Sequence, residues 1–156
     1  MNKIGICGIR GQIGNQLRLA LGDLAVEVTR EGIFRGKIDT LIWAAGSSGN
    51  RTEARDTLAE LAQLKKTLNQ IDFADIAKVV LISSGGAVYG SHSDKILNED
   101  APLNPSTPYG VMKVKIEEEF QSLSKKEDFN LSILRLANVY SLEGKGLIKT
   151  IDRKST

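Results

Sequence analysis

The sequence predicts an α/β domain with a doubly wound parallel sheet and helices on both faces of that sheet. Short apolar runs alternate with longer stretches in which apolar residues recur every three or four positions, as happens when strands and helices alternate along a chain. The first apolar run also ends at a cluster of glycines that opens the first helical stretch: Gly8, Gly11 and Gly14.

The first part of the chain begins with a strand and an amphipathic helix. Residues 3–7 form a short apolar run that stops at glycine, as a buried strand does. In residues 12–21 every fourth position is apolar, which predicts a helix, and Gly22 ends it. The V-E-V run predicts a second strand at 25–29, and the polar, glycine-bearing residues 30–37 predict a loop.

The middle of the chain continues the alternation. The run D-T-L-I-W-A-A predicts a buried strand at 39–45. Leucines at spacings of three and four predict a helix over 53–71, and a second apolar run predicts a strand at 78–83. Residues 85–104 contain glycines, a proline and scattered charges, which is typical of a long functional loop.

The last expected elements are a helix over 108–125 and a strand over 131–136. Proline suits the first turn of a helix, and Ser106 or Thr107 can cap this one. The acidic run at 117–119 and the charged run that follows the helix are interpreted as solvated surfaces without chemistry.

The composition predicts one soluble domain. A chain of 156 residues with 41% hydrophobic content can bury a core, and 21 basic against 19 acidic residues give no reason to expect nucleic acid or an anionic membrane as partner. Cys7 is the only cysteine and there is one histidine, so neither a disulfide nor a structural zinc site is expected, and Cys7 is expected to pack in the core. No segment has the length of a membrane span or a signal region, so a cytoplasmic protein is expected.

The glycine turn predicts a dinucleotide site. Glycine permits a tight turn and close approach of the backbone to a pyrophosphate, which then meets free N–H groups and the positive end of a helix dipole. The spacing is G-x-x-G-x-x-G, and the alternative is a glycine-rich turn without a ligand. The residues expected to bind the cofactor here are Gly8, Arg10, Gly11, Gln12, Ile13 and Gly14.

The choice of dinucleotide depends on the end of the second strand. An acidic residue there binds a ribose 2′-hydroxyl, whereas arginine accommodates a 2′-phosphate. Arg30 and Glu31 offer both, and Arg10 adds a second cation. Because two arginines can clamp a phosphate, NADP(H) is favoured, with NAD(H) as the alternative.

Tyr109 and Lys113 form a candidate proton-transfer pair. Four residues apart on one helix, their Cβ atoms lie roughly 5–6 Å from each other. A neighbouring ammonium and a helix N-terminus both lower the pKa of a phenol, which predicts that Tyr109 acts as a general acid and base near neutral pH. The alternative is a surface pair.

These motifs resemble the extended short-chain dehydrogenase/reductase family, which comprises sugar-nucleotide epimerases, dehydratases and reductases. The similarity rests on the glycine turn, A44-A-G46, L81-I-S-S-G-G-A-V-Y-G90, the Tyr109/Lys113 pair and L134-R-L-A-N-V-Y140. It implies a Rossmann-type fold in which the tyrosine is the catalytic acid/base and the lysine holds the nicotinamide ribose. It also implies cofactor contacts from Ala44, Ala45, Gly46, Ser83 and Asn138. The run G-I-R-G-Q-I-G with the following T-R-E looks like that of NADPH-using members.

Three departures from the family stand out. The family hydroxyl position is occupied by Gly85, so either the adjacent Ser84 replaces that hydroxyl or it is absent. The short connection between Arg30 and Asp39 leaves no room for the family's usual third strand and its helix. Family members also continue for roughly a hundred residues that build the sugar-nucleotide site, so the chain is expected to be incomplete, with one domain over 1–156 and no C-terminal substrate domain.

The resemblance implies an NAD(P)-dependent nucleotide-sugar epimerase, dehydratase or reductase, or its cofactor-binding portion, with Tyr109, Lys113 and Ser84 as catalytic residues. A non-catalytic dinucleotide-binding or regulatory module is the alternative. In the family, helices like 53–71 and 108–125 often form a dimer interface. A homodimer here would use apolar residues that could equally pack on the sheet: Leu64, Leu68, Met112, Ile116 and Phe120.

Overall fold

The computed structural model describes residues 3–49, 52–90, 97–137 and 139. Within these ranges a five-stranded sheet runs in the order β2-β1-β3-β4-β5, and every neighbouring pair of strands is parallel. The strands are β1 (Lys3–Cys7), β2 (Ala25–Val28), β3 (Ile38–Trp43), β4 (Lys78–Ser84) and β5 (Asn130–Leu136). The predicted doubly wound parallel sheet is therefore confirmed.

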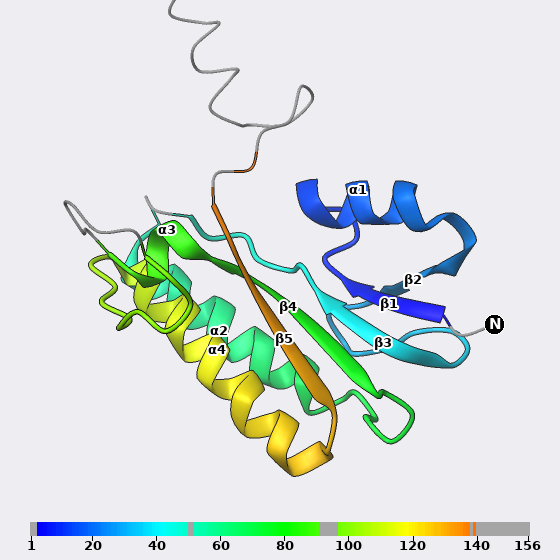
Figure 1. The fold of residues 1–156 in the computed structure, drawn as a ribbon. Coiled ribbons are helices and arrows are strands. Elements are labelled where there is room, and N and C mark those ends of the chain that lie inside the picture. Colours follow the sequence, from blue (N-terminus) through cyan, green and yellow to red (C-terminus); the bar gives the residue numbers. More distant parts are fainter. Residues whose placement is uncertain (1–2, 50–51, 91–96, 138, 140–156) are drawn as a thin grey trace, which may run out of the picture.

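Helices cover both faces of the sheet, as Figure 1 shows. On one face lies α1 (Gln12–Leu21), and on the other α2 (Ala54–Leu68) packs beside α4 (Pro108–Glu127). Two short helical segments, η1 (Gly22–Leu24) and α3 (Gly85–Val88), lie between the longer elements.

The predicted element boundaries agree with the structure to within three residues, but one segment differs in kind. Residues 85–104 were expected to be entirely loop, whereas α3 forms directly after β4. Ala87 and Val88 of α3 are buried, and α3 packs on α4 and β5. Burial of these apolar side chains stabilises a helical turn that the two glycines at its start would otherwise disfavour.

The main core lies between the sheet and the layer formed by α2 and α4. Phe120 of α4 is fully buried, and its ring packs edge-on against Trp43 of β3 with 5.6 Å between the centroids. Each apolar residue suggested for a dimer interface is buried in this core within the single chain: Leu64, Leu68, Met112, Ile116 and Phe120. Their burial confirms the alternative that they pack on the sheet, so a homodimer through these helices would have to use other residues.

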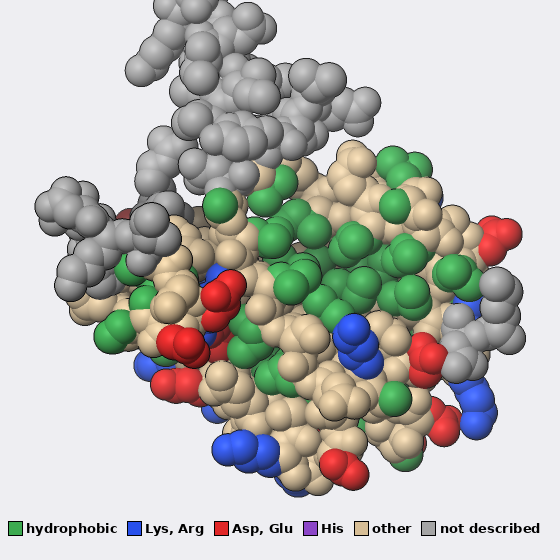
Figure 2. Space-filling model, in the orientation of Figure 1, with side chains coloured by type: hydrophobic (Ala, Val, Ile, Leu, Met, Phe, Trp, Pro, Cys, Tyr) green, Lys and Arg blue, Asp and Glu red, His purple; other side chains and the backbone are tan. Residues whose placement is uncertain are grey.

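Within the described ranges, the sheet face that carries α1 is only partly covered. Strand alternation places Val80 and Ile82 of β4 on this face, because Val79 and Leu81 are fully buried on the side of α4. Leu134 of β5 is 45% exposed, and Figure 2 shows apolar side chains gathered between α1 and β5. Parallel sheets are normally covered on both faces, whereas the residues that the structure describes leave this apolar part of the sheet open.

Cys7 is buried at the end of β1, as expected from the sequence. Burial raises the pKa of its thiol to about 12, which keeps it protonated and suits a packing role. Among the described helices, none has the combination of length and apolar character that crossing a bilayer requires.

Candidate functional site

A groove of about 1240 Å³ opens at the carboxyl ends of β1, β2 and β3. The strand order reverses between β1 and β3, and ligands of doubly wound sheets bind at such a reversal. Many of the predicted cofactor residues line this groove: Gly8, Arg10, Gly11, Arg30, Ala44, Ala45 and Gly46.

The glycine turn packs three backbone segments closely together. Gly8 has a φ of +82°, a left-handed conformation that favours glycine, and a Cβ at this position would lie 2.6 Å from the backbone of Ala45. A Cβ at Gly14 would lie 2.1 Å from the Gly8 carbonyl oxygen. A Cβ at Gly11 would meet only that same oxygen, at 3.2 Å, and Gly11 is exposed in the groove. Gly8 and Gly14 therefore serve the fold, whereas Gly11 leaves space for a ligand.

The N-terminus of α1 is suited to an anionic group. Its N-cap residue, Gly11, supplies no side-chain cap, and the first turn contains no acidic residue. The backbone amides of Gln12 and Ile13 begin the helix, where amides lack intrahelical partners and the dipole is positive. These free donors, together with the space above Gly11, fit the pyrophosphate of a dinucleotide.

Charged side chains of both signs lie at the β2 end of the groove. Arg10 forms an exposed ion pair with Glu27 of β2, with 3.2 Å between the charged atoms. Arg30 and Glu31 line the same groove and are exposed. The pKa of Glu31 is lowered, chiefly by a hydrogen bond with the Thr29 side chain. Arg10, which was expected to bind a phosphate, is thus paired with a carboxylate in the same groove.

A second pocket of about 240 Å³ brings the predicted proton-transfer residues together. Ser84, Tyr109 and Lys113 all line it, as does Ile13 of α1. The segment 44–46 contributes to both the groove and this pocket, so the turn after β3 forms a shared wall between them.

Local sequence places Tyr109 and Lys113 on one face of α4. The helix begins at Pro108, and the Thr107 side-chain oxygen accepts a hydrogen bond of 3.0 Å from the Gly110 amide, which confirms the predicted cap. Lys113 follows one turn later, with its Nζ 5.7 Å from the centroid of the Tyr109 ring. The ammonium therefore lies beside the phenol, as the spacing predicts.

The electrostatics of this pair differ from the sequence-based expectation. The pKa of Tyr109 is raised rather than lowered, because burial and then the Glu60 carboxylate disfavour the phenolate, while a hydrogen bond with the Ser84 side chain acts in the opposite direction. Lys113 is 7% exposed. Burial lowers the pKa of its ammonium, and the Glu60 and Glu117 carboxylates oppose that change.

Glu60 of α2 is a charged residue of the site that the sequence analysis missed. Its Oε2 accepts hydrogen bonds from the Ser47 amide (2.9 Å), the Ser47 hydroxyl (3.1 Å) and the Ser48 amide (2.9 Å). Burial raises the pKa of this carboxyl, but those bonds outweigh burial and the net change is downward. Glu60 lies three residues after Thr57 and four before Leu64, and both of these residues are buried. This spacing places Glu60 on the inward face of the helix, and it was the signal in the sequence that could have revealed a role for this carboxylate.

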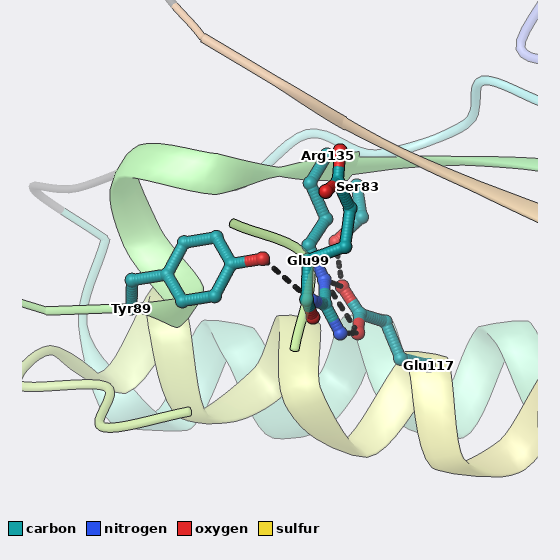
Figure 3. A network of polar contacts seen from close by, with 5 residues as sticks. All are labelled: Ser83, Tyr89, Glu99, Glu117 and Arg135. Atoms are coloured by element: carbon teal, nitrogen blue, oxygen red, sulfur yellow. Dashed lines mark hydrogen bonds and ion pairs between the residues drawn. The ribbon is translucent and has the colours of Figure 1, made fainter. Parts of the chain in front are cut away.

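Glu117 lies at the centre of a buried polar network (Figure 3). The Arg135 guanidinium pairs with Glu117 at 2.8 Å, and the Ser83 hydroxyl donates to the same carboxylate at 2.5 Å. Arg135 also donates to the Tyr89 hydroxyl at 2.6 Å and to the Glu99 carbonyl at 3.0 Å. The hydrogen bonds with Glu117 are the main reason that the pKa of Arg135 is raised. The interpretation of Glu117 as part of a solvated helix face was wrong: it is 1% exposed and compensated by Arg135.

The network affects two residues expected near the cofactor. Ser83 lines the second pocket, but its hydroxyl is directed to Glu117. A Cβ at Gly85 would lie 3.1 Å from the Arg135 carbonyl oxygen, so this position has little room for a side chain. Ser84 is then the hydroxyl beside Tyr109 at the end of β4. Asn138 lies outside the described residues.

The chain is similar to a family of known chemistry. Residues 12–153 match the model of the NAD dependent epimerase/dehydratase family. Over 83 residues the chain is 39% identical to the UDP-glucose 4-epimerase of Mycolicibacterium smegmatis, covering 53% of this chain and 24% of that protein. The chain spans between 20% and 41% of the length of the curated relatives it matches.

Solved structures share the fold at lower sequence identity. The UDP-N-acetylglucosamine 4-epimerase of Bacillus cereus superposes with a TM-score of 0.79 at 18% identity, covering 96% of this chain and 66% of that one. RMD from Pseudomonas aeruginosa, solved in complex with NADPH, superposes with a TM-score of 0.80 at 18% identity, covering 98% of this chain and 61% of that one. The sheet described above is therefore the fold of these proteins.

Proposed function

Because this chain belongs to the NAD-dependent epimerase/dehydratase family, we propose that it binds a nicotinamide dinucleotide and takes part in hydride transfer to or from a nucleotide sugar. One observation carries the proposal. The fold brings Ser84, Tyr109 and Lys113 into one pocket, and that pocket shares the turn 44–46 with the groove above the glycine turn. A phosphate cradle beside a proton-transfer pair suits nicotinamide-dependent chemistry, in which the protein binds and orients the cofactor next to the reacting groups.

In this proposal the chain holds the cofactor at three places. The amides of Gln12 and Ile13 bind the pyrophosphate, and the Lys113 ammonium binds the hydroxyls of the nicotinamide ribose. Arg10 and Arg30 would favour a 2′-phosphate, and hence NADP(H), once Arg10 exchanges Glu27 for the phosphate. When bound, the nicotinamide supplies a hydride acceptor or donor.

Tyr109 would exchange a proton with the substrate oxygen. Its raised pKa keeps the phenol protonated at neutral pH, which suits donation of a proton to a carbonyl oxygen as hydride reaches the carbon. In the reverse direction the phenolate accepts the hydroxyl proton. Ser84 favours that form, because its hydrogen bond with Tyr109 lowers the pKa of the phenol.

The test combines binding and turnover. Calorimetry with NADP(H) and NAD(H) should show binding of at least one dinucleotide. Conversion of UDP- and dTDP-sugars, followed by chromatography of the sugar and by nicotinamide absorbance, should then fall about 10²–10⁴-fold in Tyr109→Phe with cofactor affinity nearly unchanged. Tyr89→Phe is the matched control, since its hydroxyl bonds to Arg135 outside the pocket. Binding without any turnover would favour the non-catalytic dinucleotide-binding module instead.

A further inference from the structure

Two carboxylates, Glu60 and Glu117, raise the pKa of the Lys113 ammonium. They differ in how far hydrogen bonds and ion pairs with other groups compensate their charge. Glu117 lies one turn beyond Lys113 on α4, and its oxygens are taken up by Arg135 and Ser83, as Figure 3 shows. Glu60 comes from the neighbouring helix α2, and only one of its oxygens is taken up. The charge of Glu60 is therefore less compensated by other groups than that of Glu117.

The position of Glu60 is fixed beside Gly46. Ser47 and Ser48 hold Oε2 with three hydrogen bonds, whereas Oε1 is buried and has no hydrogen-bond partner within the described ranges. That free oxygen lies 3.1 Å from the point where a Cβ at Gly46 would be, and the Lys113 Nζ lies 3.9 Å from the same point. An anionic oxygen and a cationic nitrogen thus both approach Gly46 at the wall between groove and pocket, without forming a direct ion pair.

We propose that Glu60 is a positioning residue for the Tyr109–Lys113 pair: its carboxylate is the counter-charge of the Lys113 ammonium, and it opposes ionisation of the Tyr109 hydroxyl. Neighbouring charges in a half-buried setting interact several times more strongly than in water, even when they form no direct ion pair. This positioning role rests on the proposed function. The charge interaction between Glu60 and the pair, however, can be measured without cofactor or substrate.

No other carboxylate near the pair, among the residues described, has the same combination of burial and a free oxygen. The exposed acids Asp56 of α2 and Glu53 at its N-cap line the groove, and Glu99 before α4 contributes its carbonyl to the network. The charged groups that line the groove or belong to the polar network near the pair are Glu53 at the N-cap of α2, Asp56 and Glu60 on α2, Lys113 and Glu117 on α4, Arg135 on β5 and Glu99 before α4.

The first test is a ¹³C NMR titration of the lysine ε-carbons in the 156-residue chain. The Lys113 signal is assigned by its absence in Lys113→Met. Glu60→Gln keeps an oxygen acceptor for the Ser47 and Ser48 amides but removes the charge, so the Lys113 midpoint should move to lower pH. Asp56→Asn removes a carboxylate one turn away in the groove and should leave the midpoint in place. An unchanged midpoint in Glu60→Gln, or an equal change in both variants, overturns the proposal.

The second test isolates Tyr109. In a Lys113→Met background, tyrosinate absorbance is followed against pH, and the curve of the matching Tyr109→Phe variant is subtracted. Adding Glu60→Gln should move the Tyr109 midpoint to lower pH, because the phenolate no longer faces a carboxylate. A merely structural Glu60 would leave this midpoint unchanged, and that result overturns the proposal.

Folding of the variants provides a third outcome. If Glu60→Gln alone fails to fold because the Lys113 ammonium is left without its counter-charge, the double variant Glu60→Gln/Lys113→Met should recover a cooperative thermal transition. Failure of that rescue counts against the pairing. None of these measurements uses a dinucleotide or a sugar, so a chain that proves inactive leaves them valid, and their failure leaves the proposed function standing.

Discussion

Ser83 and Ser84 are consecutive residues at the end of β4, yet their side chains lie in different surroundings. Ser83 Oγ donates to the buried Glu117 carboxylate at 2.5 Å, whereas Ser84 lines the second pocket together with Tyr109. Ser83 is 4% exposed, and Ser84 is only partly buried. One strand end thus supplies a hydroxyl to the polar network of the core and another to the candidate site.

The two serines should separate stability from function. Ser83→Ala removes a hydrogen bond to a buried charged group, which should lower the free energy of unfolding by about 1.5–3 kcal/mol. Ser84→Ala should leave the free energy of unfolding nearly unchanged, because a water molecule can take the place of the partly exposed Ser84 hydroxyl. It should also reduce turnover less than Tyr109→Phe does. Urea unfolding of both variants checks the contrast; equal destabilisation would contradict it.

The Glu117–Arg135 pair should be far more sensitive to the loss of one partner than to the loss of both. Arg135→Met leaves a carboxylate that is 1% exposed without its counter-charge, which should destabilise the chain by about 3–5 kcal/mol. Adding Glu117→Leu should recover much of that loss. The exposed pair Lys65–Glu119 joins α2 to α4 at 2.9 Å and is the control, because its removal should change stability by about 0–1 kcal/mol. Additive losses at the buried pair would show that the two charges are not coupled.

Features set by local sequence were predicted correctly. The apolar runs and their spacing indicated the five strands and the long helices, and Thr107 and Pro108 indicated the start of α4. The glycine spacing indicated the turn between β1 and α1, and the i, i+4 relation placed Lys113 beside Tyr109. Each of these depends on residues that are close together in the chain.

What the sequence did not reveal depends on contacts between distant elements. Glu117 looked solvated in an acidic run, and only the pairing of α4 with β5 brings Arg135 to it. Glu60 depends on the segment that follows β3, where the amides of Ser47 and Ser48 hold its carboxylate. Burial, together with the same carboxylate, reverses the expected direction of the Tyr109 pKa, which spacing on one helix could not show.

The glycines of the turn should divide into those needed for folding and one needed for binding. Gly14→Ala places a Cβ 2.1 Å from the Gly8 carbonyl oxygen and should destabilise the chain by roughly 1–3 kcal/mol, seen as a lower melting temperature. Gly11→Val should have a smaller effect on melting but should weaken dinucleotide binding by at least about tenfold, because its side chain enters the groove. Equal NADP(H) affinity of Gly11→Val and the parent in calorimetry would disprove the role of Gly11.

Self-association through α2 and α4 stays a prediction, with different residues from those first suggested. The large apolar side chains still exposed on these helices are Leu58 (61%) and Val111 (41%). If the helices form a homodimer, Leu58→Ser and Val111→Ser should each shift sedimentation toward the monomer, whereas Leu19→Ser on α1, an equally exposed apolar residue at 59%, should not. A parent chain that is monomeric at high micromolar concentration would exclude this interface.

Cofactor preference should depend on the competition between Glu27 and a 2′-phosphate for Arg10. Arg10 and Arg30 line the groove, and Arg10 is paired with Glu27 at 3.2 Å. Arg10→Ala with Arg30→Ala should abolish any preference for NADP(H) over NAD(H), since charge-assisted bonds of this kind contribute about 1.5–3 kcal/mol each. Glu27→Gln should act in the opposite direction and strengthen NADP(H) binding, because Arg10 then has no ion pair to break before it binds the phosphate. Affinities for both cofactors in all three proteins, measured by calorimetry at one salt concentration, test the scheme. A parent that prefers NAD(H), with no change in Glu27→Gln, would transfer the ribose contact to Glu31, whose exposed carboxylate lines the same groove.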